Sequence, residues 1–409
     1  MYDLLIIGGG AAGFFTAINC AEEHPKLKIA ILEKNKEVLQ KVRISGGGRC
    51  NLTNATFTPA ELVRNYPRGH KELLSPFHRF MCGDVMAWFE AHGVALKIEE
   101  DGRVFPASNT SETIVNCFLQ QLKTNDIDLF TEQNVKEITF AEGVWRVATP
   151  TATFTSRNLV ITTGSNPKMW QLLEGLGHSI VPPVPSLFTF QTPIMWVKEL
   201  QGIAVTAEVS LLDTNRKPLR INETAPLLFT HKGFSGPAIL RASAWGARLL
   251  AELNYRCVLS INFTANIGAS LSFNSTFEAL QHFKQQNGRK SVASYPLYDL
   301  PKRLWLALLA AVCIPTQTLW AELNKQQQKD LALALSHTEV PIDGKATFKD
   351  EFVTAGGVKL SEVNFKSYES KLHKGLYLAG EVLDIDAITG GFNFQNAWTG
   401  GYIIAQSIT

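Results

Sequence analysis

The sequence of 409 residues lacks the patterns that mark several common classes of protein. Its six cysteines are scattered without a C-x-x-C pair, so neither a zinc site nor a disulfide framework is predicted, and a reducing compartment is favoured. The formal net charge of +2 is too small to indicate binding to nucleic acid or to an acidic membrane surface. We therefore expect no metal and no nucleic-acid partner.

Long hydrophobic runs are also missing. The longest apolar stretch, residues 304–314, is too short to cross a bilayer and stops at Pro315, which predicts a buried helix. The first apolar run is only a few residues long and follows Asp3, so it does not resemble a signal peptide. These absences predict a cytoplasmic protein with no membrane partner. The length predicts about two to three domains.

A glycine pattern stands near the start of the chain. Leu4 to Ile7 is an apolar run suited to a buried parallel strand, and Ala11 to Glu22 is typical of a helix. Between and within them, Gly8, Gly10 and Gly13 have G-x-G-x-x-G spacing. Such glycines permit a tight turn, close approach of a pyrophosphate and close packing of helix on strand. The helix N-terminus then attracts the phosphates.

An acidic residue follows the next predicted strand. Residues 28–32 form a second apolar run that ends at Glu33. A carboxylate at this position accepts hydrogen bonds from the ribose hydroxyls of an adenosine and repels a 2′-phosphate. The first site is therefore predicted to hold FAD or NAD and not NADP.

A second glycine cluster lies in residues 43–54, RISGGGRCNLTN. Three consecutive glycines disfavour both helix and strand, and their neighbours Ser45, Arg49 and Asn51 are polar. The cluster predicts a loop that presents backbone N–H groups to an anion or to a planar ring.

Two further strands are predicted to enter the same sheet. Residues 158–163 form an apolar strand followed by Gly164, which permits close approach to a cofactor. Residues 165–170 are expected to form a short loop near the cofactor or its entry. Near the other end of the chain, residues 375–379 predict a strand, and a glycine pair then precedes a helix predicted at 394–407.

The composition changes in the middle of the chain. Prolines at 182, 183 and 185 indicate a boundary, after which residues 187–263 are rich in β-prone runs and residues 276–336 are typical of helices. Within the β-prone part, Ser235 is expected to be an N-cap, with Pro237 in the first turn of a helix that continues to about Leu253.

Four motifs carry a resemblance to a known family. They are IIGGGAAG at 6–13, SGGGRCNLTN at 45–54, LLFTHKGFSGPAIL at 227–240 and GLYLAGEVLDIDAITGGFNFQNAWTGGY at 375–402. The chain resembles the BaiN/YhiN-like NAD(P)/FAD-dependent oxidoreductases of the two-domain FAD superfamily. The resemblance covers nearly the whole chain, and the second and fourth motifs are specific to that family.

The resemblance implies an α/β fold with a discontinuous domain organisation. Residues 1–185 and 345–409 would form a Rossmann-like FAD-binding domain of the two-domain flavoprotein type. Residues 186–275 and 337–344 would form an inserted β-barrel-like domain, which itself contains a helical insertion at 276–336. The two glycine-rich ends of the chain would then meet across one bound cofactor.

The resemblance also implies roles for individual residues. The first glycine loop would hold the pyrophosphate, Glu33 the ribose and the backbone of Val135 the adenine. Glu381 would bind the ribityl chain or a nearby phosphate through water, and the backbone N–H groups of residues 391–393 would face the N1/O2 edge of the flavin. The residues predicted to contact the cofactor are Gly8, Gly10, Ala11, Ala12, Gly13, Glu33, Lys34, Arg43, Ser45, Gly46, Gly47, Arg49, Cys50, Asn51, Val135, Thr163, Gly164, Gly380, Glu381, Gly390, Gly391, Phe392 and Asn393.

Few residues are candidates for catalysis. His231 can transfer a proton near neutral pH, although a structural role in the loop before a helix is the alternative. Cys50 has no neighbouring cysteine with which to form a redox pair, so packing is favoured over redox chemistry. Arg43 and Arg49 are expected to bind the cofactor phosphates in preference to an anionic substrate.

The predicted function is that of an FAD-dependent oxidoreductase, which passes hydride through a bound flavin, from NAD(P)H to a small organic acceptor. Because the sequence contains no second nucleotide-binding fingerprint, NAD(P)H would bind only transiently as the electron donor. One alternative is an amine oxidase that passes electrons to oxygen. An alternative of another class is a non-catalytic flavin-bound or RNA-associated protein.

Overall fold

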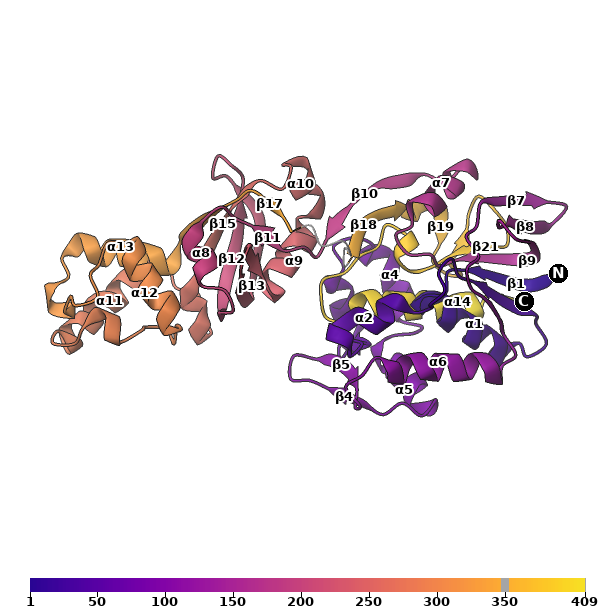
Figure 1. The fold of residues 1–409 in the computed structure, drawn as a ribbon, viewed down its shortest axis with the longest axis horizontal. Coiled ribbons are helices and arrows are strands. Elements are labelled where there is room, and N and C mark those ends of the chain that lie inside the picture. The colour runs from indigo at the N-terminus through magenta and orange to yellow at the C-terminus, as the bar shows by residue number, and fades with distance from the viewer. Residues whose placement is uncertain (347–352, 409) are drawn as a thin grey trace. The chain divides into compact units, whose positions relative to one another are not determined.

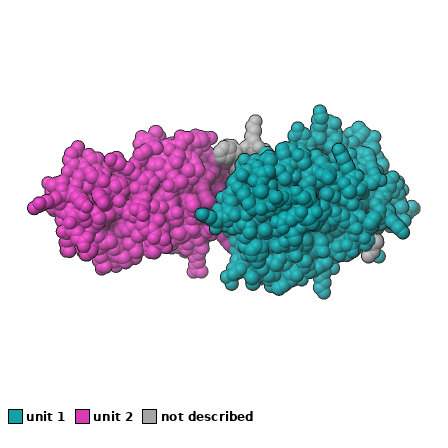
Figure 2. Space-filling view, turned by 90° about the horizontal axis from the view of Figure 1, so that it is seen from below, with its two compact units in different colours: residues 1–183, 353–409 teal, residues 184–352 magenta. Residues whose placement is uncertain are grey.

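The computed structural model describes residues 1–346 and 353–408. The chain forms two compact units, which Figure 2 colours separately: residues 1–183 with 353–409 are unit 1, and residues 184–352 are unit 2. Unit 1 is thus built from both ends of the chain. The predicted division into three domains is finer than these two units and stays a prediction.

The centre of unit 1 is a parallel sheet with the strand order β21-β9-β1-β2-β6. Two short antiparallel strands, β20 and β19, extend it beyond β21, and the β7–β8 hairpin pairs with β9. The strands are β1 Tyr2–Ile7, β2 Ile29–Leu32, β6 Asp128–Phe130, β7 Glu137–Ala141, β8 Val144–Ala148, β9 Thr153–Ile161, β19 Val363–Asn364, β20 Glu369–Ser370 and β21 Leu376–Leu378. The predicted Rossmann-like sheet is confirmed, because β1, β2 and β9 are neighbours in it.

Unit 1 also contains helices. They are α1 Ala11–Glu23, α2 Gln40–Gly48, α3 Pro59–Leu62, α4 His70–Phe77, α5 Cys82–Ala91, α6 Glu112–Thr124, α7 Pro167–Gly175 and α14 Phe392–Ala405. The first and last helices, α1 and α14, lie side by side (Figure 1). Gly401 makes this possible, because a Cβ there would lie 3.1 Å from the carbonyl oxygen of Ala12. The two ends of the chain therefore share one core.

An aromatic cluster fills that core. Phe15 of α1 lies 4.7 Å from Trp88, 6.3 Å from Phe89 and 5.3 Å from Trp398, measured between ring centroids. Phe118 of α6 closes the cluster at 5.7 Å from Trp398. Rings at such tilted angles pack well, so four helices are held together behind the sheet.

Unit 1 also contains a small antiparallel sheet, a separate strand pair and short 3-10 helices. A small antiparallel sheet contains β3 Thr53–Asn54, β5 Arg103–Pro106 and β4 Leu96–Ile98 in that order. A separate pair joins β18 Val353–Val358 to β10 Ile180–Ser186, whose last three residues belong to unit 2. The short 3-10 helices of the unit are η1 Val63–Asn65, η5 Leu360–Glu362 and η6 Gly380–Val382.

Unit 2 is built on an antiparallel sheet with the order β16-β15-β12-β13-β14-β11-β17. The strands are β11 Phe190–Gln191, β12 Ala204–Leu212, β13 Pro218–Thr230, β14 Gly233–Ser235, β15 Cys257–Asn262, β16 Thr338–Ile342 and β17 Gly344–Lys345. Only Asp343 separates β16 from β17, although they lie at opposite edges of the sheet. The edges must therefore approach each other, which gives a curled, barrel-like sheet as predicted.

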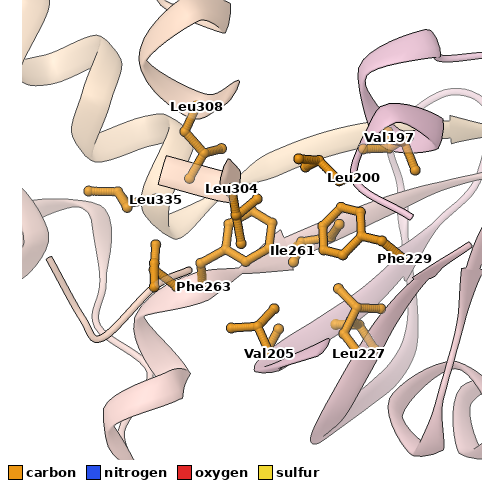
Figure 3. Close-up of a cluster of buried hydrophobic side chains, with 14 of the residues drawn as sticks. Val197, Leu200, Val205, Leu227, Phe229, Ile261, Phe263, Leu304, Leu308 and Leu335 are labelled. Atoms are coloured by element: carbon orange, nitrogen blue, oxygen red, sulfur yellow. The ribbon is translucent and has the colours of Figure 1, made fainter. Parts of the chain in front are cut away.

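The helices of unit 2 share a hydrophobic core with this sheet. In Figure 3, Leu304 and Leu308 of α12 point toward the sheet. They meet Phe229 of β13, Ile261 of β15 and Phe263, which follows β15. Leu304, Ile261 and Phe263 are fully buried. The helices are α8 Met195–Glu199, α9 Pro237–Trp245, α10 Ala247–Glu252, α11 Phe273–Asn287, α12 Lys302–Ala311 and α13 Lys325–Ser336, with 3-10 turns η2 Phe263–Ile267, η3 Val292–Ser294 and η4 Trp320–Glu322.

Two local expectations were wrong. Ser235 lies in β14 and shares a hydrogen bond with the hydroxyl of Thr189, while Gly236 is the N-cap of α9. The predicted helix to Leu253 is also broken at Gly246, which ends α9 and precedes α10.

The expected loop at 165–170 is a third error. The helix α7 begins there at Pro167, and the Asn166 side chain accepts the backbone N–H groups of Lys168 and Met169 at 3.0 and 3.4 Å. Asparagine as N-cap followed by proline at the first helical position is a recognised start signal. The start signal is therefore present in the sequence, and a helix stands where a loop was expected.

Candidate cofactor site

The first glycine loop connects β1 to α1 at the carboxyl edge of the parallel sheet, where ligands of such folds bind. A Cβ on Gly8 would lie 2.6 Å from the carbonyl oxygen of Thr162, and one on Gly13 would overlap the carbonyl of Gly8. Both glycines are therefore needed for backbone packing. Gly10 differs, because no atom lies within 4 Å of a Cβ built there. The open side of the loop is at Gly10.

Glu33 stands at the end of β2 beside this loop. Its carboxylate accepts the backbone N–H of Gly9 and that of Asn35, each at 2.9 Å, and the residue is 9% exposed. Each oxygen keeps further acceptor capacity for a hydroxyl group. Lys34, the next residue, is exposed. The structure thus fixes the carboxylate next to the glycine loop.

Val135 lies in the connection between β6 and β7, close to Glu33. The backbone N–H of Gln133 donates to the carbonyl of Glu33 at 2.8 Å, which brings this connection to the end of β2. Among the described residues, no hydrogen bond reaches the backbone N–H or C=O of Val135. These groups are thus free to serve the adenine, the role predicted for them.

The second glycine cluster adopts a conformation that only glycine adopts readily. Gly46, Gly47 and Gly48 have φ angles of 57°, 69° and 83°, so α2 ends in a short left-handed segment. A Cβ on Gly47 or Gly48 would meet no atom within 4 Å. The predicted open backbone surface is therefore present, although it continues a helix and is not a separate loop. Ser45, at its start, accepts the N–H of Cys50 at 3.0 Å.

The two arginines of this segment contact carboxylates of the protein itself. Arg43 pairs with Glu112, while Arg49 pairs with Glu99 at 2.7 Å and lies over the ring of Phe105. Their predicted role in binding the cofactor phosphates stays a prediction, and it would require these pairs to open.

Cys50 is fully buried, and burial raises the pKa of its thiol to about 12, although a hydrogen bond with Ser45 lowers it in part. A thiol with so high a pKa is almost never a thiolate at neutral pH. Packing therefore explains Cys50 better than redox chemistry does.

The C-terminal segment reaches the site through residues 384–391. Asp386 is fully buried and forms a two-point ion pair with Arg68. The Asn54 side chain donates to the carbonyl of Gly390 at 3.1 Å. Asn51, in the amide orientation that satisfies both of its groups, accepts the N–H of Gly391 at 3.0 Å. Three side chains from the first 70 residues thus hold this segment in place.

The helix α14 begins at the end of that segment. Its N-cap Gly391 has φ 94°, and a Cβ there would overlap the backbone of Thr53. In this orientation of the Asn51 amide, the Gly391 N–H is bound to Asn51, so its predicted role toward the flavin stays a prediction and would require this hydrogen bond to open. Phe392 and Asn393 occupy the first turn, where backbone N–H groups have no partner within the helix. Those two residues remain the predicted donors.

The Asn393 side chain strengthens the same turn. It accepts the N–H of Ala387 at 3.0 Å and donates to the carbonyl of Ala387 at 3.1 Å. The carbonyl of Phe392 also accepts the hydroxyl of Tyr66. The first turn of α14 is therefore rigidly positioned, as an electrostatic role would require.

The remaining predicted residues join the two ends of the chain. Gly380 lies against the first turn of α1, since its Cβ would be 3.4 Å from that of Ala12. Glu381 accepts the N–H of Thr354 at 2.9 Å and pairs with Lys41, and its carboxylate lies 3.6 Å from the Cβ position of Gly164. The partner Lys41 was missed by sequence reasoning, because no motif marks it.

His231 lies elsewhere. It is exposed on the tight turn between β13 and β14 of unit 2, whereas the other predicted residues all lie in unit 1. Its proposed proton transfer stays a prediction.

The residues of unit 1 fit FAD on their own geometry. Gly10, Gly47 and Gly48 leave space where side chains would otherwise stand, as a bound cofactor requires. The Thr163 hydroxyl is buried and forms no hydrogen bond within the described residues, and the same holds for the Asn396 side-chain oxygen on α14. Unpaired buried polar atoms are costly, so a ligand at these positions would satisfy groups that the protein leaves open.

Comparison with known proteins agrees with this geometry. The HI0933-like protein Rossmann domain family matches residues 2–407. The chain belongs to this family. Among curated relatives, it is 28% identical over 418 residues to the ribosomal RNA dihydrouridine synthase of Escherichia coli, covering 100% of this chain and 98% of the relative. It is 26% identical to the 3-dehydro-bile acid delta(4,6)-reductase of Clostridium scindens, with 98% of each chain covered.

The solved structures show the same fold. A 3-ketosteroid-delta4-(5alpha)-dehydrogenase from Rhodococcus jostii superposes with a TM-score of 0.51 at 12% identity, covering 100% of this chain and 96% of that chain. As a family member, the chain is a flavoprotein oxidoreductase, and FAD is the cofactor that fits. No helix among the described residues has both the length and the apolar character needed to cross a membrane.

Proposed function

We propose that this protein is an FAD-dependent reductase that takes hydride from NAD(P)H and saturates a carbon–carbon double bond conjugated with a carbonyl group. The names of the two relatives given above describe saturation of such a bond, one in a uracil ring and one in an oxo-steroid. The observation within the chain that carries the proposal is the rigid first turn of α14, with its backbone donors at Phe392 and Asn393.

In this proposal the chain supplies binding, orientation and electrostatics. The open loop at Gly10 and the N-terminus of α1 bind the pyrophosphate, and Glu33 binds the ribose. Bound FAD supplies a ring that accepts a hydride from a donor and delivers it to an acceptor. The N–H groups of Phe392 and Asn393 would face the ring edge where negative charge develops, which would favour acceptance of the hydride.

The first test is spectroscopic. The purified protein is mixed anaerobically with NADPH or NADH while the flavin absorbance is followed. Bleaching within seconds is expected, followed by recovery when a conjugated enone is added. If only a small amine bleaches the flavin, and oxygen is then reduced to peroxide, the protein is an amine oxidase and the reductase proposal fails.

A ribosomal RNA acceptor is a second candidate. The name of the 28% identical relative favours it, whereas the weak net charge of the chain argues against it. The bleached protein is offered either unmodified ribosomal RNA or a 3-oxo-4-ene steroid under the same conditions. Recovery of flavin absorbance with RNA alone, together with dihydrouridine in the digested RNA, would assign the RNA substrate. Recovery with the steroid alone would assign a small-molecule acceptor.

A further inference from the structure

The start of α2 places Lys41 next to the first glycine loop. Leu39, the N-cap of α2, has φ 60° and donates its N–H to the carbonyl of Gly9 at 2.8 Å. Lys41 follows two residues later, in the first turn of the helix. The backbone that carries Lys41 is therefore attached directly to the loop that contains Gly10.

A second set of contacts reaches Lys41 from the opposite end of the chain. Gly380 packs against Ala12 in the first turn of α1, and the next residue, Glu381, forms the ion pair with Lys41. The other carboxylate oxygen of Glu381 is fixed by the N–H of Thr354 at 2.9 Å. The two sets of contacts meet at Lys41. Together with residues 9–12 they close a ring of contacts that includes Gly10, where no side chain fills the space.

With FAD bound, the negative charges at this ring would need a cation to balance them. A pyrophosphate diester carries two negative charges, and Glu381 adds a third. The two arginines of the same stretch pair with carboxylates outside this ring, Arg43 with Glu112 and Arg49 with Glu99, whereas the carboxylate that pairs with Lys41 belongs to it. The Lys41 side chain is 53% exposed, so its ammonium can turn from the carboxylate to a phosphate without a change of backbone.

We propose that Lys41 binds the pyrophosphate of FAD, and that its ion pair with Glu381 holds the ammonium at the site before the cofactor arrives. Glu381 is then a positioning residue for Lys41. This inference rests on the assignment of the site to FAD. It does not depend on the electron donor or acceptor, so it can fail or succeed independently of the proposed reductase activity.

The test measures binding of FAD to the full-length apoprotein by the quenching of flavin fluorescence. Lys41→Met is compared with Lys36→Met, which removes an exposed lysine after β2 that has no part in the ring. Loss of one charge-assisted contact to phosphate raises the Kd for FAD about tenfold in Lys41→Met. The dependence of Kd on salt concentration also becomes weaker. Lys36→Met binds like the wild type, and Lys41→Arg, which keeps the charge, retains most of the affinity.

Competition by fragments of FAD identifies the part that Lys41 contacts. ADP, which carries the diphosphate, should bind Lys41→Met more weakly by a factor similar to that of FAD, whereas riboflavin, which has no phosphate, should bind it unchanged. If ADP binds the variant as tightly as the wild type, Lys41 serves Glu381 or the ribityl chain, and the proposal is overturned. Equal FAD affinity of Lys41→Met and wild type overturns it as well. Unchanged thermal unfolding of the apoprotein variant separates either result from misfolding, because an exposed ion pair contributes little to stability.

Discussion

The two loops of the candidate cofactor site are held in different ways. The loop at residues 8–13 is held by its own backbone, since Gly8 and Gly13 pack where no side chain would fit. The segment at 384–391 is held by side chains far away in sequence, among them Arg68, Asn51 and Asn54. The first loop is thus specified by local spacing, and the second by long-range polar contacts.

This difference has an energetic consequence. A loop that is packed through its backbone is destabilised when a methyl group is added. A loop that is held by buried polar side chains is destabilised when one partner of a contact is removed. Removing one partner of a buried ion pair leaves an uncompensated charge, which costs more than most steric changes. The predictions below test this contrast, from the largest expected effect to the smallest.

The largest effect is expected for Asp386→Ala, which leaves Arg68 without its carboxylate. Because Asp386 is fully buried, the free energy of unfolding should fall by about 3–5 kcal/mol. Urea unfolding of the apoprotein, followed by tryptophan fluorescence, measures the loss. The control is Asp101→Ala, which breaks the exposed pair with Arg103 and should cost less than about 1 kcal/mol. Equal losses of unfolding free energy in the two variants would show that burial does not make the Asp386–Arg68 pair more important than an exposed pair.

The next effect is expected for Gly13→Ala. Alanine gains about 1 kcal/mol in helix propensity, but its methyl group would overlap the carbonyl of Gly8, so a net loss of about 2 kcal/mol follows. The same urea experiment measures it. A variant as stable as the wild type would mean that α1 can move away from β1 at little cost.

Gly10→Ala should separate binding from stability. Since no atom lies within 4 Å of the added methyl group and φ is −99°, the apoprotein should change by less than about 1 kcal/mol. The methyl group would occupy the space of the pyrophosphate, so the Kd for FAD should rise about tenfold. Calorimetric titration with FAD checks this. An unchanged Kd would place the pyrophosphate away from Gly10.

The smallest effect concerns pH. The Nδ1 of His178 shares a hydrogen bond with Glu362 at 2.9 Å, and its Nε2 shares one with Ser370 at 3.0 Å. Burial lowers the pKa of His178, and the hydrogen bond with Glu362 opposes part of that change. The unfolded chain, with a histidine pKa of about 6.5, therefore binds the proton more readily.

The stability that His178 contributes is thus fully present above about pH 6.5 and is lost as the pH falls toward its folded pKa. The expected slope is at most about 1.4 kcal/mol per pH unit. Unfolding of the wild type and His178→Gln between pH 5 and 8 measures it, since the substitution should flatten the curve below neutral pH. Parallel curves would show that His178 does not change its charge on unfolding.

The sequence predicted the local features of the site well. Gly8, Gly10 and Gly13 and the carboxylate of Glu33 lie where their spacing indicated, because a strand, a tight turn and a helix are determined by neighbouring residues. The start of α7 could also have been predicted from Asn166 and Pro167.

The long-range contacts could not be predicted in the same way. Arg68 and Asp386 are 318 residues apart, and Lys41 and Glu381 are 340 apart, so no spacing rule links them. The same holds for the contact between the Asn51 side chain and the N–H of Gly391, which only the folded chain brings together. The predicted contact of Asn51 with the cofactor stays a prediction.

The discontinuity of unit 1 sets an order of events during synthesis. On the ribosome, β1, α1 and the first glycine loop emerge early, but α14, which packs on α1, is made from residues 392–405. Unit 2 is complete well before then and can fold as a unit of its own. The candidate site for FAD is complete only when residues 380–393 have been made, so FAD can occupy the whole site only late in synthesis or after it.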